Sequence, residues 1–291
     1  MKKILIQSLF ALASTFAAAT ALADCGNCAK WNTEQTPFAL YGNSYYVGVH
    51  GLSAVLITSP SGHVLIDGGL PESAPLVEAH IRQLGFRPED IKYILSSHPH
   101  FDHAGAIAEL QRISGATVIA SAASAKVLAT GIAGEDDPQY WDNTAQFTPI
   151  AHVRVAHDGE VLQLGAAAFT VHETFGHTPG STSWTWQSCA DGQCENMVYA
   201  DSLSAVSNDT YKFSDHPAYV AAMRHSFDVV AALPCDVMVS AHPEFSDLWT
   251  REAKRAQLGQ RAFIDTDACR KYATAARAGL AERLEEERKA R

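Results

Sequence analysis

The chain has 291 residues, enough for one large α/β domain or two small ones with a self-sufficient hydrophobic core. Its 22 basic and 32 acidic side chains give a formal net charge of −10. Nucleic-acid backbones and anionic membrane surfaces attract cationic proteins, so this balance argues against both as partners.

The first 23 residues have the pattern of a cleavable secretory signal. Two lysines precede an apolar run over residues 4–18, and a small-residue cleavage box follows at 21–23. We therefore expect cleavage before Asp24 and one mature domain over residues 24–291. A retained membrane anchor is the alternative, but the apolar run is short for a membrane span.

The six cysteines are typical of an oxidising compartment. Sequence alone leaves their pairing open, but three pairs suggest themselves: Cys189 with Cys194 across a turn, Cys235 with Cys269 between the last strand and the C-terminal helix, and the remaining Cys25 with Cys28. The third pair is the least certain, because a Cys-x-x-Cys segment could instead be a redox or metal site.

The first half of the chain combines a β pattern over residues 38–67 with alternating helices and strands. We expect strands at 44–49, 53–58, 63–66, 91–95 and 117–120, and helices at 71–84, 104–113 and 121–130. A long polar segment follows over residues 131–149. Because it contains Tyr140, Trp141 and Phe147, we expect a substrate-facing loop there, with a simple surface connection as the alternative.

The second half has strand patterns followed by helices, like the first. The expected strands are 153–155, 161–164, 169–172, 183–186, 197–200 and 237–240, and the expected helices are 216–233 and 267–291. Two similar halves of this kind predict an α/β fold with two mixed β-sheets packed face to face and helices outside.

The densest group of candidate metal ligands lies between the strand at 91–95 and the helix at 104–113. Here His98, His100, Asp102 and His103 fall within six residues. Imidazole and carboxylate are ligands that zinc accepts at roughly 2.0 to 2.2 Å. A strand-to-helix loop can direct the first two side chains to one side and the last two to the other, and so supply two metal ions. A polar loop with unrelated histidines is the alternative.

Two more histidines follow expected strands and precede turn residues. His177 lies in Gly-His-Thr-Pro-Gly, and His242 lies in Ala-His-Pro. A zinc pair needs more than four ligands, so both are candidate ligands. The other histidines lie in expected strands, turns or helix faces, where we expect structural roles: His50, His63, His80, His152, His157, His172, His216 and His225.

The segments 98–103, 176–180 and 241–243 together resemble the metallo-β-lactamase superfamily, from about residue 36 onward. The resemblance implies a four-layer αβ/βα sandwich with the site along one edge. Residues 199–204 (Tyr-Ala-Asp-Ser-Leu-Ser) and 233–236 are similar to the third subclass of class B β-lactamases. That similarity implies hydrolysis of the ring amide of penicillins, cephalosporins and carbapenems by a zinc-bound hydroxide, and thus antibiotic resistance in the periplasm.

The resemblance also implies a role for each ligand. His98, His100 and His177 would hold a first zinc ion, and Asp102, His103 and His242 would hold a second. As the catalytic residue, Asp102 would also orient the attacking hydroxide. Asp67 resembles the family's aspartate that steadies the ligand loop.

A substrate carboxylate also needs a partner. Ser202 resembles, in its position, a cysteine ligand of the first subclass. The stretch that follows it has no lysine or arginine before Lys212. We therefore expect the hydroxyls of Ser202 and Ser204 to bind the carboxylate, with turn capping as the alternative.

Asp201 leaves the subfamily open, because it could align with the aspartate that bridges both metals in glyoxalase-type hydrolases of the same superfamily. Secretion favours a β-lactamase, since a glutathione thioesterase belongs where glutathione is. A secreted lactonase or phosphodiesterase of this fold is a second hypothesis. A non-catalytic zinc-binding protein is a third, although structural zinc sites are usually closed and cysteine-rich. We expect a monomer that acts on a small molecule.

Overall fold

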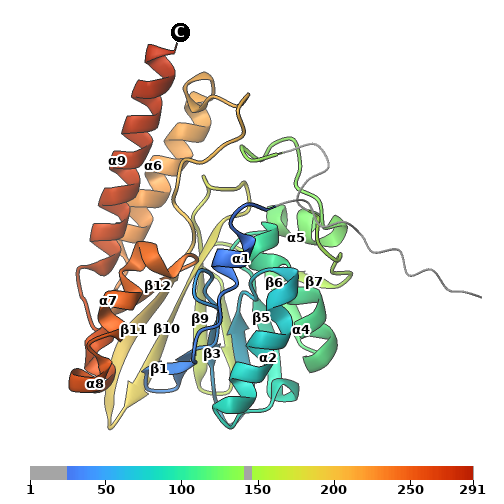
Figure 1. The fold of residues 1–291 in the computed structure, drawn as a ribbon, viewed down its shortest axis with the longest axis vertical. Helices are drawn as coiled ribbons and strands as arrows, with labels where there is room; N and C mark the ends of the chain where they lie inside the picture. Colours follow the sequence, from blue (N-terminus) through green and yellow to red (C-terminus); the bar gives the residue numbers. More distant parts are fainter. Residues whose placement is uncertain (1–24, 141–145, 291) are drawn as a thin grey trace, which may run out of the picture.

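The computed structural model describes residues 25–140 and 146–290, so the expected signal segment lies outside the described residues. Two mixed β-sheets face each other and helices cover their outer faces (Figure 1). This arrangement confirms the expected αβ/βα sandwich. Among the helices of the described part, none is long and apolar enough to cross a membrane.

The first sheet has seven strands in chain order: β1 Phe38–Tyr41, β2 Ser44–Tyr46, β3 Val55–Ile57, β4 His63–Ile66, β5 Ile91–Leu95, β6 Thr117–Ala120 and β7 Val153–Val155. The strands from β1 to β4 form an antiparallel meander, and those from β4 to β7 are parallel. Ile66 pairs with Leu95, so the residues that follow β4 and β5 emerge together at one edge of the sheet.

The second sheet has five strands in the order β12 Val237–Ser240, β11 Gln193–Ala200, β10 Thr182–Ala190, β9 Ala167–Glu173 and β8 Val161–Leu164. Only β11 and β12 are parallel, with Ala200 opposite Ser240. Asp201 and His242, which follow these two strands, therefore emerge close together.

Two sequence-based expectations were wrong. Residues 153–155 do not open the second sheet, because β7 pairs with β6 in the first sheet. A three-residue edge strand carries no pattern that specifies its partner. The helix expected over 104–113 is also divided into α3 Phe101–Ala104 and α4 Ile107–Ser114. Asp102 and His103 consequently lie in a helical turn and not in an open loop.

The remaining helices are α1 Cys28–Trp31, α2 Ala74–Gln83, α5 Ala122–Thr130, α6 Pro217–Ala232, α7 Leu248–Glu252, α8 Arg255–Leu258 and α9 Ala268–Lys289. Short 3₁₀ segments are η1 Pro71–Ser73, η2 Pro88–Asp90, η3 Phe213–Asp215, η4 Pro243–Ser246 and η5 Gly259–Phe263. The structure pairs Cys25 with Cys28, Cys189 with Cys194 and Cys235 with Cys269.

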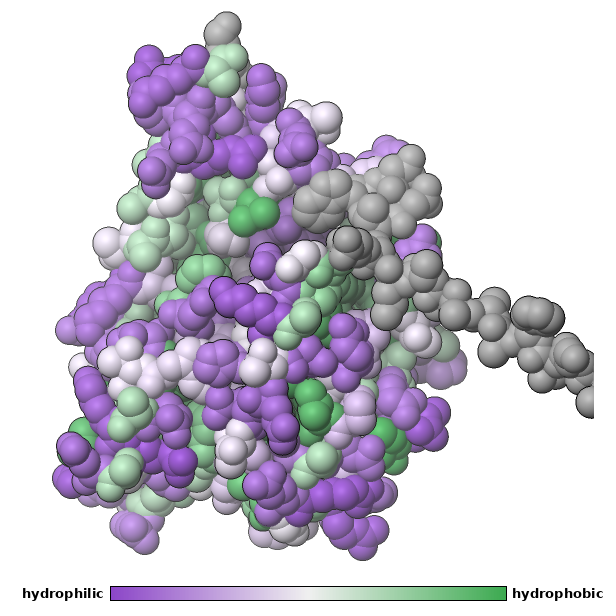
Figure 2. Space-filling model, viewed as in Figure 1, coloured by the Kyte–Doolittle hydropathy of each residue, from purple (hydrophilic) through white to green (hydrophobic). Residues whose placement is uncertain are grey.

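Three apolar layers hold the sandwich together. The middle layer lies between the sheets and includes the fully buried Trp184 and Tyr199. A second packs α2 and α4 on the first sheet, and a third packs α6 and α9 on the second sheet. Burial of apolar surface on both faces of each sheet is the main stabilising contribution. The face of the molecule shown in Figure 2 is mostly hydrophilic, with small separate apolar patches.

Candidate metal centre

The loop after β5, which carries the histidine motif, is hydrogen-bonded to both sheets. Asp67, directly after β4, accepts hydrogen bonds from the Ser97 backbone N–H at 2.7 Å and from the Ser97 hydroxyl at 2.6 Å. From the second sheet, the Trp184 indole donates to the Ser96 carbonyl at 3.2 Å, and the Thr182 N–H donates to the Ser97 carbonyl at 2.8 Å. The backbone before His98 is thus fixed by contacts from two directions.

Asp67 is fully buried and has a positive φ of 56°, an unusual conformation for a residue other than glycine. Burial raises its pKa to about 7, and hydrogen bonds from Ser97 and Tyr199 oppose this rise. The Tyr199 hydroxyl lies 2.8 Å from Asp67 Oδ2 and 3.1 Å from the Ser53 carbonyl oxygen. The Ser53 hydroxyl in turn donates to the Ser240 carbonyl at 2.7 Å. This buried network links the histidine motif to the strand that precedes His242.

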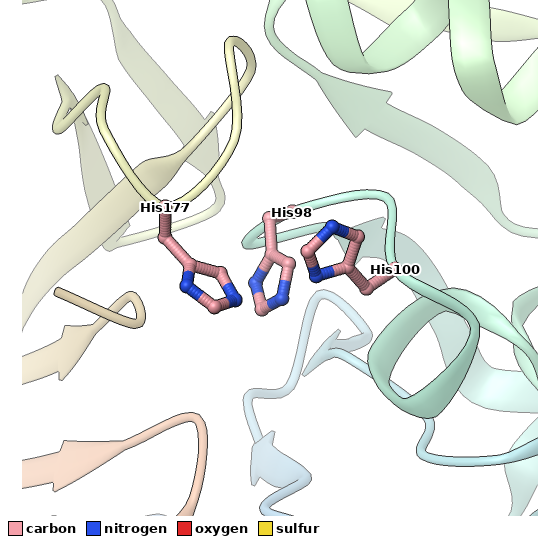
Figure 3. Close-up of side chains that lie close together, drawn as sticks. All are labelled: His98, His100 and His177. Atoms are coloured by element: carbon pink, nitrogen blue, oxygen red, sulfur yellow. The ribbon is translucent and has the colours of Figure 1, made fainter. Parts of the chain in front are cut away.

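The first group of predicted ligands converges as the sequence suggested. His98, His100 and His177 come from two different loops and point toward one another (Figure 3). Their ligand atoms all lie within 4.8 Å of one another, and the same is true of His98, Asp102 and His103.

The second group of predicted ligands, Asp102, His103 and His242, has the spacing of ligands around one ion. The Nε2 atoms of His103 and His242 lie 3.3 Å apart, and they are 3.3 Å and 3.4 Å from Asp102 Oδ2. A tetrahedral zinc ion with bonds of roughly 2.0 Å would separate its ligand atoms by about 3.3 Å. These three side chains fit a metal ion without rearrangement.

Four of the rings have a hydrogen-bond partner on their outward nitrogen. The contacts are His98 Nδ1 to Asp201 Oδ1 at 2.6 Å, His100 Nε2 to Asp137 Oδ2 at 2.9 Å, His177 Nδ1 to the Ser204 carbonyl at 3.1 Å, and His242 Nδ1 to the Gly51 carbonyl at 3.1 Å. An imidazole that donates its outward N–H turns the lone pair of its other nitrogen inward. The inward Nε2 of His98 is buried and has no partner within the described residues, as a metal ligand would be before the ion is added.

The charge states of His98, His177 and Asp102 also fit a metal site. At His100 and His242 burial lowers the pKa, but the carboxylates of Asp137 and Asp102 outweigh it and raise the pKa of each ring. Burial lowers the pKa of His177 to about 3 and that of His98 well below its ordinary value, so both rings are neutral at neutral pH. Burial would raise the pKa of Asp102, but His103 and His242 hold it well below its usual range. Neutral imidazoles and an ionised carboxylate are the forms that bind metal ions.

Two acidic residues next to the rings have roles that the sequence did not reveal. Asp201 accepts from the outward nitrogen of His98, so it lies behind that ring and not between two metal positions. Asp137 does the same for His100, and its pKa lies below the usual value because His100 opposes the effect of burial. Asp137 belongs to the polar segment 131–149, whose sequence has no periodicity that would place it.

A cavity of about 370 Å³ opens over the ligands. Its lining includes the ligands His100, Asp102, His177 and His242, the apolar Trp31, Pro99, Phe101, Ile132, Ala133, Val206 and Phe245, and the polar Asn27, Gln139, Gln146, Ser204 and Glu244. Thus Ile132, Ala133, Gln139 and Gln146 of the segment 131–149 face the cavity. Of the aromatic residues on which the expectation rested, Tyr140 is not part of the lining, Phe147 is buried in an apolar cluster, and Trp141 lies outside the described residues. Neither lysine nor arginine occurs among the described residues of the lining. Ser204 belongs to the lining, whereas Ser202 is only 4% exposed and does not.

We predict that Asp137→Asn lowers the affinity for zinc about tenfold to a hundredfold, because loss of a partner on a ligating histidine typically has an effect of this size. Competition with a chromophoric zinc chelator measures it. The exposed neighbour Asp136, replaced in the same way, is the control. Equal affinities in the two variants would show that Asp137 does not support His100.

Comparison with known proteins agrees with this geometry. The family model of the metallo-beta-lactamase superfamily matches residues 47–242. The solved structure of the Rm3 metallo-beta-lactamase is 55% identical in sequence, with a TM-score of 0.88, over 91% of this chain and 99% of that one. MEM-A1, a subclass B3 metallo-beta-lactamase from a soil metagenome library, is 52% identical, with a TM-score of 0.87, over 90% of this chain and all of that one.

Several curated relatives match over much shorter stretches, and the chain spans less than half of their length. One is an N-acyl homoserine lactonase from a Bacillus species, 36% identical over 73 residues, which are 17% of this chain and 29% of the lactonase. The likeness to the β-lactamases covers 91% and 90% of this chain. The chain belongs to the metallo-β-lactamase superfamily and, within it, resembles the hydrolases of subclass B3.

Proposed function

We propose that the chain is a periplasmic β-lactamase that binds two zinc ions and hydrolyses the ring amide of penicillins, cephalosporins and carbapenems. The observation that carries this proposal is the convergence of six His and Asp ligands under an open cavity. The extended similarity to two β-lactamases supports the substrate class. Pairing of all six cysteines and the signal-like first 23 residues support an oxidising compartment outside the cytoplasm.

A zinc pair, when bound, would lower the pKa of a shared water so that a nucleophile is available near neutral pH. Within the chain, His98, His100 and His177 would hold one ion, and Asp102, His103 and His242 the other. Asp102 also belongs to the cavity lining, so it can accept a hydrogen bond from the attacking water and orient it.

A serine nucleophile is excluded by access and by geometry. Ser97 Oγ and Asp201 Oδ1 contact the same nitrogen of His98, Nδ1, at 3.2 Å and 2.6 Å, whereas a triad needs the serine and the carboxylate on opposite ring nitrogens, and all three residues are fully buried. No substrate could reach the Ser97 hydroxyl. Ser204 contacts His177, but the outward nitrogen of that ring faces a serine and no carboxylate.

We predict that the purified protein hydrolyses nitrocefin and imipenem, that a chelator abolishes the activity, and that zinc restores it. Asp102→Asn should lose most of the turnover, because it weakens one metal position and the orientation of the water together. Asp228→Asn, which alters an exposed ion pair with Arg277, is the control and should keep full activity.

The same assay distinguishes the other functions. Hydrolysis of an N-acyl homoserine lactone without hydrolysis of either β-lactam would make the chain a lactonase. Zinc binding without turnover of either substrate class would leave a non-catalytic zinc-binding protein. Near-normal β-lactam turnover by Asp102→Asn would contradict the role given to this carboxylate.

The described lining of the cavity offers a serine hydroxyl, and no lysine or arginine, as a partner of the substrate carboxylate. Ser204 Oγ lies 3.1 Å from His177 Nδ1. Because that nitrogen carries the proton, the serine oxygen accepts, and its own O–H is free to donate toward the cavity. We propose that Ser204 binds the carboxylate directly and that the nearly buried Ser202 does so through water.

We predict that Ser204→Ala raises KM for penicillins about tenfold, because an exposed hydrogen bond to a charged group contributes about 1.4 kcal/mol. Ser202→Ala should raise KM only about twofold to threefold. In both variants kcat should change less, since contacts far from the scissile bond are similar in ground and transition states. Zinc content should stay unchanged, because the Ser204 carbonyl still accepts from His177. An unchanged KM in Ser204→Ala would mean that another group holds the carboxylate.

A further inference from the structure

The stretch from residue 133 to residue 140, which carries Asp137, is tied to the rest of the molecule at few points. Among the described residues, only three residues outside this stretch form hydrogen bonds with it. Two are the metal-site histidines: His100 contacts Asp137, and His177 Nε2 lies 3.2 Å from the Gln139 amide nitrogen. The third is Asn208, which lies outside the metal site.

Asn208 makes two short bonds to this stretch. Its backbone N–H donates to the Pro138 carbonyl at 2.8 Å, and its Nδ2 donates to the Tyr140 carbonyl at 2.6 Å. Tyr140 N–H donates back to the Asp137 carbonyl at 2.9 Å, and Gln139 N–H donates to the Asp137 carboxylate at 2.8 Å. Residues 137–140 therefore form one hydrogen-bonded turn, and Asn208 donates to two of its carbonyl groups, those of Pro138 and Tyr140.

The Asn208 side chain is itself fixed in orientation. Its Oδ1 accepts from the backbone N–H of Thr210 at 2.9 Å and from that of Tyr211 at 2.8 Å, as asparagine does in turns. With the oxygen engaged in this way, the amide nitrogen must point toward Tyr140. The geometry uses both ends of the amide, which neither aspartate nor alanine can do.

The C-terminal helix anchors the segment that carries Asn208. Glu287 of α9 accepts from the backbone N–H of Phe213 at 3.0 Å, and Arg283 donates to the Ser207 hydroxyl at 2.7 Å and to the Tyr211 carbonyl at 3.2 Å. In Figure 1 this segment runs beside the upper ends of α6 and α9. Asn208 thus connects the segment anchored by the C-terminal helix to the turn that faces the ligands.

We propose that Asn208 is a positioning residue that holds the turn 137–140 against the first metal position, so that Asp137 supports His100 and Gln139 forms the cavity wall beside His177. The effect of Asn208 on substrate turnover rests on the function proposed above. The effect of Asn208 on zinc binding is independent of that function, because the contact between Asp137 and His100 requires no substrate.

The test compares Asn208→Asp with Asn208→Ala. The aspartate keeps an oxygen for Thr210 and Tyr211 but loses the donor to Tyr140. Both variants should lower zinc affinity about threefold to tenfold, less than a direct partner of the ligand would. Both should also raise KM for β-lactams by a similar factor with kcat within about twofold, since the turn forms part of the cavity wall. Zinc competition and steady-state kinetics give these values.

Asn196→Ala is the matched control, because the Asn196 amide donates to Asp236 at 2.7 Å away from the metal site. It should change neither zinc affinity nor KM. Wild-type zinc affinity and KM in Asn208→Asp would overturn the proposal, even if the melting temperature falls. If the wild-type chain turns over no β-lactam but Asn208→Asp still weakens zinc binding, the proposed function fails and the positioning role stands.

Discussion

A buried imidazole that presents a lone pair to a metal ion carries its proton on the other nitrogen, and that N–H needs an acceptor. In this protein four of the five ligand rings have such an acceptor, from Asp201, Asp137 and the carbonyl groups of Ser204 and Gly51, whereas His103 Nδ1 has no partner among the described residues. These acceptors come from three separate segments of the chain, because Asp201 and Ser204 follow the same strand. The fold therefore makes this arrangement possible, because each of these four rings needs an acceptor that its own local sequence does not supply. Without such partners, buried polar atoms would each cost about 1 to 3 kcal/mol.

Two of the parallel strand pairs, β4 with β5 and β11 with β12, bring these distant segments together. Because β4 and β5 end together, Asp67 reaches the backbone of Ser97, and because β11 and β12 end together, Asp201 and His242 meet the same edge. Tyr199 and Ser53 then connect the two edges through the buried network. A network of this kind is stiff when every member is satisfied and costly when one is removed, so both metal positions are expected to respond to changes in it.

The sequence predicted the parts of the site that are local and chemically dense. His98, His100, Asp102 and His103 stand in one short motif, and the other two histidines follow recognisable strands. Asp137 and Asn208 could not be found in this way, because each acts on a residue far along the chain and neither lies in a periodic pattern. The same limit applies to β7, whose sheet is decided by a neighbour and not by its own three residues. Strands β4, β5, β6, β8 and β12 agree with their expected bounds because apolar runs between turn residues define them.

The central claim is that six convergent ligands form two metal positions. Its most direct test is titration of metal-free protein with zinc, followed by native mass spectrometry at each step. The account predicts saturation at two ions per chain, with both retained on dilution into metal-free buffer. Saturation at one ion, or a second ion that is lost on dilution, would contradict it, because Asp102, His103 and His242 are already spaced as ligands of one ion.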